Sequence, residues 1–236
     1  MEQRRETKSL TERTCDDIRN AIVYAKFEPG QKLRIDALAS QFNASSGVVR
    51  EVLSRLTAEG LVNALPQRGF TVAPMSLNDL KELTEARIDL ELTCLQRSIE
   101  YGDTEWETQV LSAIHRLVSE PHPVLGVTDD VMTRRSAPSR WHLLHEDFHS
   151  ALTSACGNRW WLLMRKQLYT QSERYRRLST PMTIGNRDIN SEHQAIADAT
   201  LARNSAKACE LLEKHLMRTT DLLLQSPIFA LAGNRG

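Results

Sequence analysis

Two short amphipathic helices in close succession constrain the fold of this chain more than any other feature. Apolar side chains at Ile35 and Leu38 begin a three- and four-residue repeat, as on one face of a helix. The same spacing returns from Val49 onward, after a short turn in which Ser45 or Ser46 can cap the second helix. Two short helices joined by a tight turn are typical of a helix-turn-helix.

A hairpin follows the second helix. The runs 61–64 and 70–73 predict two short strands, and the turn between them has Arg68 and Gly69 at its tip. Helix pairs also arise by chance in helical proteins, so the pair alone is weak support for any function. The hairpin changes this, because two helices and a hairpin in this order form the winged version of a DNA-binding module.

The predicted module has its own basic surface. Lysine and arginine together number 30, as do aspartate and glutamate, so the chain has no net charge to attract nucleic acid. The cations in or beside the module are Lys32, Arg34, Arg50, Arg55 and Arg68. We expect the second helix, from Ser45 to Glu59, to enter the major groove of double-stranded DNA. The residues that we expect to contact DNA are Arg34, Ser45, Ser46, Arg50, Arg68 and Gly69.

The chain is long enough for two domains. In its 236 residues we expect a winged helix-turn-helix over residues 1–75 and a second domain over residues 76–236. Its four cysteines lie far apart, which favours free thiols in a reducing compartment over a disulfide framework. The N-terminus lacks the apolar core of a signal peptide, and no stretch approaches the length of a membrane span. We therefore expect a cytoplasmic protein that does not enter the membrane.

The second domain has a helical pattern throughout. Its predicted helices cover residues 76–101, 104–120, 139–155, 158–179, 187–203 and 205–225, with Ser76 and Asn204 as candidate N-caps. Three prolines and a glycine between 121 and 139 indicate a loop with room for one short helix. A further helix, at 11–25, precedes the winged module, and no strand pattern occurs after Ala73. The chain is therefore predicted to be mostly α, with an N-terminal winged helix-turn-helix and a C-terminal all-helical bundle.

Four histidines lie on the apolar stripes of three predicted helices. His145 and His149 share one stripe, four residues apart, while His193 and His215 lie on two others. A single inward histidine is usually a satisfied core residue, but four without a common partner would leave buried polar atoms unpaired. A divalent transition metal would satisfy all four. Imidazole ligands suit zinc, nickel, cobalt or copper rather than magnesium or calcium, and we favour zinc or nickel.

Arg87 is a permanent charge on the predicted apolar stripe of the first bundle helix, which consists of Leu80, Leu83, Leu90 and Cys94. This placement is costly unless an anion meets the guanidinium. One candidate is Glu91, one helical turn away, in an internal salt bridge. The other is a small carboxylate effector bound between Arg87 and the metal, with a five-carbon dicarboxylate as first choice.

Several of these segments resemble a known family. The winged segment has the sequence LRIDALASQFNASSGVVREVLSRLTAEGLVNALPQRGFTVAPMS. It resembles the GntR family of bacterial transcription regulators. Three later segments resemble the FCD subgroup of this family, whose ligand-binding domain is an all-helical bundle. They are LKELTEARIDLE, HEDFHSALTSACGN and EHQAIADATLARNSAKACELLEKHL. The likeness runs from about Thr11 to Leu224. Within the subgroup, GDTEWETQVL and the His145–His149 pair look most like the carbon-starvation-induced regulators of glutarate and aminobutyrate use.

The resemblance implies particular site residues. The family's metal ligands fall on His149, His193 and His215, and its effector-facing arginine falls on Arg87. Members usually have an aspartate four residues before the first of these histidines, where this chain has His145. The replacement keeps a candidate ligand but removes a negative charge. The site would then be more positive and would favour an anionic ligand.

Taken together, these features predict a dimeric bacterial transcription factor rather than an enzyme. It would bind a palindromic operator as a homodimer, and its carboxylate effector would shift the placement of the two recognition helices. The sequence fits repression as well as activation. One rival is a metal-responsive regulator, in which the ion itself is the signal. The other is a metal-dependent hydrolase, which needs a general base such as Glu192 and leaves the winged module unexplained.

Overall fold

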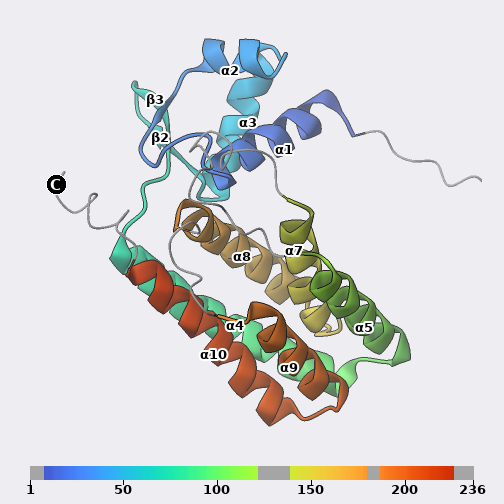
Figure 1. Cartoon of the computed structure of the whole chain (residues 1–236). Helices are drawn as coiled ribbons and strands as arrows, with labels where there is room; N and C mark the ends of the chain where they lie inside the picture. Colours follow the sequence, from blue (N-terminus) through green and yellow to red (C-terminus); the bar gives the residue numbers. More distant parts are fainter. Residues whose placement is uncertain (1–7, 122–138, 180–186, 226–236) are drawn as a thin grey trace, which may run out of the picture. The chain divides into compact units, whose positions relative to one another are not determined.

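A computed structural model describes residues 8–121, 139–179 and 187–225 of the chain (Figure 1). The chain divides into two compact units, Met1–Met75 and Ser76–Gly236. The loop predicted between 121 and 139 lies, apart from its two end residues, outside the described part of the chain. None of the described helices combines the length and the apolar character needed to cross a membrane.

The first unit is a helix-turn-helix with a small sheet. Its elements are α1 (Leu10–Val23), β1 (Lys32–Leu33), α2 (Ile35–Gln41), α3 (Ser46–Ala58), β2 (Val62–Leu65) and β3 (Gly69–Val72). The strands lie in the order β1-β3-β2 and pair antiparallel. The β2–β3 hairpin is the predicted wing. Strand β1 was not predicted, because two residues are too few to show a periodic pattern.

The helix pair forms because its apolar residues meet in one core. The residues of α2 and α3 buried there are Leu38, Val49, Val52, Leu53 and Leu56. Of the two candidate caps, Ser45 is the one that caps α3, with its hydroxyl accepting a hydrogen bond from the Val48 amide at 3.3 Å. In the turn before it, Asn43 adopts a left-handed backbone conformation with φ of 49°. The short polar side chain of asparagine tolerates that conformation better than most.

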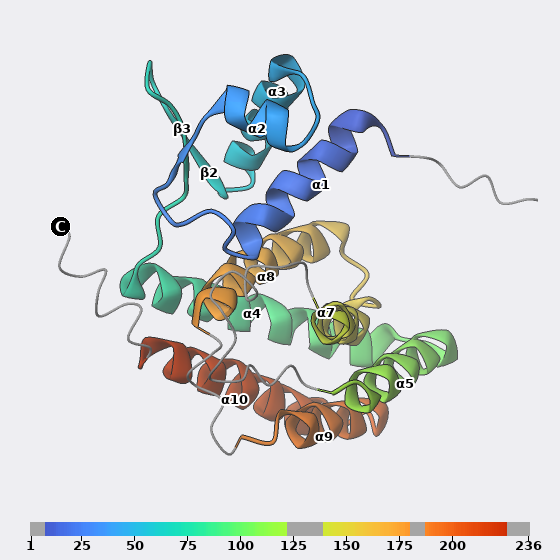
Figure 2. The ribbon, with the colours of Figure 1, turned by 45° about the horizontal axis from the view of Figure 1, so that its top comes forward.

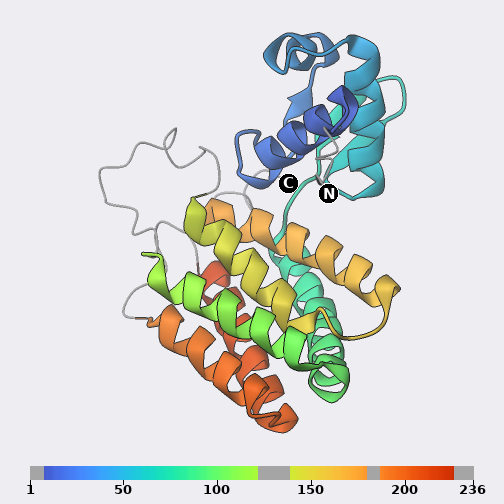
Figure 3. The ribbon, with the colours of Figure 1, turned by 90° about the vertical axis from the view of Figure 1, so that its right-hand side faces the viewer.

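The second unit is an all-helical bundle, as predicted. Its described helices are α4 (Leu77–Tyr101), α5 (Thr104–Ser119), α7 (Arg140–Thr153), α8 (Arg159–Ser179), α9 (Ile189–Leu201) and α10 (Ser205–Leu224). Helix α4 packs against α7, α8 and α10, while α5 packs against α7 and α9 (Figures 2 and 3). Four of these helices begin at a side-chain cap that accepts the amide of the third residue on, namely Ser76, Asp103, Asp188 and Asn204.

The buried face of α4 is rotated from the predicted one. We expected Leu83 and Leu90 to share the buried stripe with Arg87, but all three are only partly buried. Leu80 and Cys94 are buried as predicted, and the other buried residues are Thr84, Ile88, Glu91, Leu95, Ser98 and Ile99. The prediction failed because it counted apolar residues alone. Thr84 and Glu91 are buried because each finds a polar partner inside the bundle, on α10 and α8 respectively.

Candidate functional site

The bundle brings the four predicted histidines together at its centre. Helix α7 supplies His145 and His149, α9 supplies His193, and α10 supplies His215. All four side chains are buried, and one ring nitrogen from each lies within 4.8 Å of those of the others. The ring centroids of His145 and His149 are 4.5 Å apart, and those of His193 and His215 are 4.7 Å apart. Four imidazole nitrogens at this spacing are within reach of a single ion.

Among the described residues, the ring nitrogens of His149 have no hydrogen-bond partner. Both of its nitrogens are buried and make no hydrogen bond to any described residue. A buried imidazole without partners is costly, since each polar atom loses its bond to water and gains none in return. His145 differs, because its Nδ1 lies 3.1 Å from the Tyr169 hydroxyl and 3.2 Å from Nη1 of Arg176. The four histidines therefore fit a transition metal with nitrogen ligands, and His149 is the ligand for which the structure gives the strongest support.

Burial favours the uncharged form of three histidines of the cluster. Burial lowers the pKa of His145 well below its usual value, and the Arg176 guanidinium lowers it further. Burial likewise lowers the pKa of His149, and the neighbouring His215, His193 and Arg87 lower it further. The pKa of His215 is lowered in the same direction, again mainly by burial. Neutral imidazole is the form that binds a metal, so these rings need lose no proton near pH 7.

Glu192 lies on the outer side of His215. Its Oε2 is 2.9 Å from Nδ1 of His215, and Arg187 donates to both of its oxygens, at 2.8 and 2.5 Å. Arg218 adds a bond at 3.0 Å. Burial acts to raise the pKa of Glu192, but the contacts with His215 and Arg187 outweigh it and lower the pKa to about 2. The carboxylate is therefore ionised at neutral pH.

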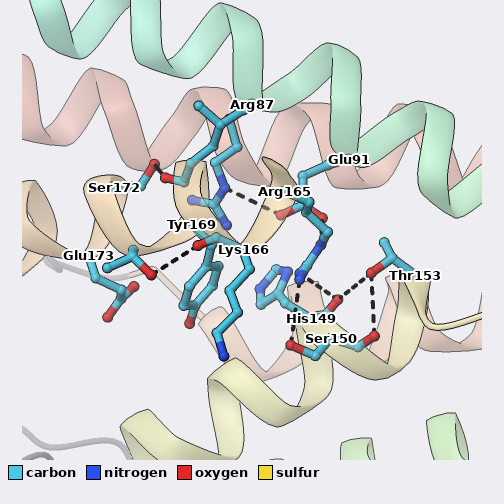
Figure 4. A network of polar contacts seen from close by, with 12 residues as sticks. Arg87, Glu91, His149, Ser150, Thr153, Arg165, Lys166, Tyr169, Ser172 and Glu173 are labelled. Carbon is cyan, nitrogen blue, oxygen red and sulfur yellow. Dashed lines mark hydrogen bonds and ion pairs between the residues drawn. The ribbon is translucent and has the colours of Figure 1, made fainter. Parts of the chain in front are cut away.

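A buried ion-pair network joins α4, α8 and α7 beside the histidines (Figure 4). Glu91 accepts a bond from Nε of Arg165 at 2.7 Å and a longer one from Nε of Arg87 at 3.4 Å. Arg165 also donates to the backbone carbonyl of His149 at 2.7 Å. Arg165 is thus the main partner of Glu91. The salt bridge between Arg87 and Glu91, one of the two predicted alternatives, exists but is the weaker of the pair.

Arg87 faces a small cavity next to the histidine cluster. Its guanidinium lies over the Tyr169 ring, 4.9 Å from the centroid, and its two terminal nitrogens bind no described residue. His145, His149, His215 and Arg176 line the same cavity, which has a volume of about 30 Å³. That is room for about two water molecules. Arg165 and Arg176, which the sequence patterns did not single out, belong to the site as well, and both lie on α8.

The six residues predicted to contact DNA are all exposed on the first unit. They are Arg34, Ser45, Ser46, Arg50, Arg68 and Gly69. The three arginines have no ion-pair partner among the described residues, whereas Arg55 on the same helix as Arg50 is paired with Glu51 at 2.5 Å. Arg68 is at the turn of the β2–β3 hairpin. Unpaired cations on α3 and the wing are the kind of surface that phosphates bind.

Family models match both units. The model of the bacterial regulatory proteins of the gntR family matches residues 10–72, and the FCD domain model matches residues 82–218. The chain belongs to the GntR family, in its FCD subgroup. It is therefore a transcription regulator of the GntR type, a family whose members bind DNA operators and typically form dimers.

Curated relatives and a solved structure agree with this assignment. The uncharacterised HTH-type transcriptional regulator BphR of Paraburkholderia xenovorans is 38% identical over 92% of this chain and 86% of the relative. The HTH-type transcriptional repressor GlaR of Escherichia coli is 33% identical over 92% of this chain and 95% of the relative. The structure of Escherichia coli McbR/YncC matches with a TM-score of 0.73 at 19% identity, covering 93% of this chain and 99% of that one. These relatives are named regulators and not enzymes.

Proposed function

We propose that this regulator holds one divalent transition metal, zinc or nickel, among its four buried histidines, and that the metal anchors a small carboxylate effector. The observation that supports the metal most strongly is His149, a buried imidazole whose two nitrogens bind no described residue. The proposed ligands are His145, His149, His193 and His215. Such an ion supplies a positively charged position at which an anion can coordinate.

The proposed effector is a dicarboxylate that spans the metal and Arg87. One carboxylate would take an open position on the metal, and the other would bind the unoccupied terminal nitrogens of Arg87 in a bidentate pair. The four ligands bring no negative charge, so an anion is favoured there. The cavity of about 30 Å³ is too small for a five-carbon molecule, so binding would displace the Arg176 side chain from its contact with His145.

The proposed coupling to DNA runs through the start of α4. Arg87 lies on this helix, whose cap, Ser76, is the first residue of the second unit. The hydroxyl of Tyr175 on α8 contacts the backbone amide and carbonyl of Ser76, both at 3.2 Å. Arg176, the residue after Tyr175, lines the cavity. A ligand that moves this part of α8 would therefore also displace Ser76, which follows the wing in the chain. The effector would thereby change the fit of a homodimer to its palindromic operator.

The proposed outcome at the operator is repression relieved by the effector. The relative GlaR is named a repressor, and we extend this to the present chain. In the DNA complex, Arg50 with Ser45 and Ser46 would contact base edges, while Arg34 and the wing residues Arg68 and Gly69 would hold phosphates or the minor groove.

Elemental analysis of protein purified without added metal tests the metal centre. We expect one equivalent of zinc or nickel per chain, or uptake of one equivalent on reconstitution. A chain that stays well below one equivalent after reconstitution would contradict the proposal. An ion lost under mild dialysis, with DNA affinity changing as it leaves, would instead identify a metal-responsive regulator.

Calorimetry tests the effector. Glutarate, succinate and butyrate would be titrated into metal-loaded wild type and Arg87→Ala. We expect the two dicarboxylates to bind wild type, and Arg87→Ala to lose most of that affinity while keeping its metal. A variant that binds dicarboxylates as tightly as wild type would reduce Arg87 to a partner of Glu91. If no carboxylate binds either protein, the effector proposal fails and the metal proposal stands separately.

A further inference from the structure

The carboxylate of Glu192 is fixed by contacts with three side chains. Both of its oxygens accept bonds from Arg187, Oε1 accepts a third from Arg218, and Oε2 also contacts Nδ1 of His215. Arg187 in turn donates to the backbone carbonyl of His215 at 3.1 Å and to the Thr219 hydroxyl at 2.9 Å. The carboxylate is therefore fixed with respect to both the ring and the backbone of His215.

These contacts determine which nitrogen of His215 holds the proton. Nδ1 has two neighbours, the carboxylate oxygen at 2.9 Å and Nη2 of Arg187 at 3.2 Å. An ionised carboxylate can only accept a hydrogen bond, and a guanidinium can only donate one. The carboxylate is the closer, and Nη2 of Arg187 already donates to Glu192 at 2.5 Å. The proton therefore lies on Nδ1 and points at Glu192, which leaves the lone pair on Nε2.

We infer that Glu192 is a positioning residue for the metal centre: it fixes the tautomer and orientation in which His215 presents Nε2 to the ion. The inference rests on the proposed metal site. A metal-bound histidine whose other nitrogen donates to a carboxylate is both oriented and made more basic, and loss of such a partner typically weakens metal affinity by about 10–100-fold. Glu192 thus acts through His215 and does not itself bind the ion.

The same contacts separate this role from that of a general base, which the hydrolase rival would require of Glu192. A base needs a carboxylate oxygen within reach of the water it deprotonates. Both oxygens of Glu192 are already engaged by three side chains, and the one nearest the cluster faces Nδ1 of His215, away from the nitrogen left to bind the metal. A carboxylate in this position can orient the metal-binding side chain of His215 but cannot deprotonate a water on the metal.

The metal affinity of matched variants tests the inference. Zinc dissociation constants of the full chain would be measured by competition with a chelating indicator for wild type, Glu192→Ala, Glu192→Gln and Asp198→Asn. Asp198→Asn is the control, because this substitution removes one negative charge from an exposed position of the same helix. Asp198 accepts a hydrogen bond from Gln194 there. We expect Glu192→Ala to weaken zinc binding by about 10–100-fold and Asp198→Asn to leave it within about twofold of wild type.

Glu192→Gln keeps the test decisive if the alanine variant fails to fold. Its amide oxygen can still accept the proton of Nδ1 but has no charge, so we expect a loss of zinc affinity that is smaller than that of the alanine variant. Both variants binding zinc as tightly as wild type would overturn the inference. Wild type that binds no zinc would instead contradict the proposed metal centre, which is a separate and recognisable outcome.

Nitrogen NMR of the metal-free chain adds a readout that does not depend on the ion. The imidazole resonances of His215 in wild type should show the proton on Nδ1, and Glu192→Ala should lose that preference. A wild-type spectrum with the proton on Nε2 of His215 would overturn the assignment, even if zinc affinity fell in the variants.

Discussion

Arg50 and Arg55 lie on the same helix but in different electrostatic settings. Arg50 is exposed and has no ion-pair partner among the described residues, while Arg55 is paired with Glu51. We predict that Arg50→Ala weakens DNA binding by about 1–3 kcal/mol if it contacts a base edge, or lowers the salt dependence of binding if it holds phosphate. Arg55→Ala is the control and should change binding much less.

Fluorescence anisotropy at two salt concentrations measures both variants, on a duplex selected by the wild-type protein from a random library. If Arg50→Ala bound this duplex like wild type at both salt concentrations, its assignment to the DNA interface would be wrong.

The buried histidines predict how the metal-free protein responds to pH. Their pKa is lowered on folding, so the unfolded chain takes up more protons as the pH falls through 6.5. Stability is therefore complete above 6.5 and is lost below it, by up to about 1.4 kcal/mol per pH unit for each histidine. Glu192 does not contribute in this range, since its pKa of about 2 lies far below it.

Thermal unfolding of metal-free protein between pH 7.5 and 5.5 measures the effect, and we expect the unfolding midpoint to fall. The variant His149→Gln removes one titrating ring and should flatten the dependence. A midpoint in wild type that does not change over this range would contradict neutral burial of the cluster.

At the residue level, the sequence patterns identified site residues of the bundle where polar residues interrupt an apolar stripe. The four histidines could be predicted because each lies at helical spacing among residues such as Leu144 and Ile196. Arg165 could not, because its partner Glu91 is 74 positions away, and no local pattern links them. Glu192 was noted as a nearby carboxylate, but its contact with His215 depends on the packing of α9 against α10.

Elements were predicted best where periodicity is long. The described bundle helices end within a few residues of the predicted boundaries, and Ser76 and Asn204 are caps as expected. Errors occurred where pattern is short or misleading. Strand β1 has two residues and forms because β3 offers a free edge. The face of α4 was misplaced because Thr84, a polar residue, is buried against Thr220 at 2.8 Å.

The metal centre should act as a clamp between helices. Its proposed ligands come from α7, α9 and α10, so an ion bound to the folded state alone stabilises the packing of all three. With zinc at 100 times its dissociation constant, we predict a gain of about 2.7 kcal/mol in the free energy of unfolding. The double variant His149→Ala/His193→Ala should lose this gain.

Differential scanning calorimetry with and without zinc measures the gain, and His115→Ala, which removes an exposed histidine of α5, is the matched control. An equal rise of the unfolding midpoint in the double variant would place the ion elsewhere in the chain.

At the scale of the whole molecule, the account joins a DNA-binding unit to a sensor through linkage. Each unit has a hydrophobic core of its own. If the effector changes operator affinity by some factor, the operator must change effector affinity by the same factor, and typical factors are about 5–150. The ion, Arg87 and α4 are then parts of one equilibrium, and removal of the ion or of the Arg87 side chain should abolish the response without preventing DNA binding itself.

Operator affinity with and without effector tests this account most directly. The measurement is the anisotropy of a selected operator duplex with zinc-loaded full-length protein, alone and with saturating glutarate or succinate. We predict that a dicarboxylate weakens operator binding at least about fivefold, and that metal-stripped protein and Arg87→Ala bind the operator but do not respond. Operator affinity that is the same with and without these dicarboxylates, or that falls equally in the metal-stripped protein, would contradict it.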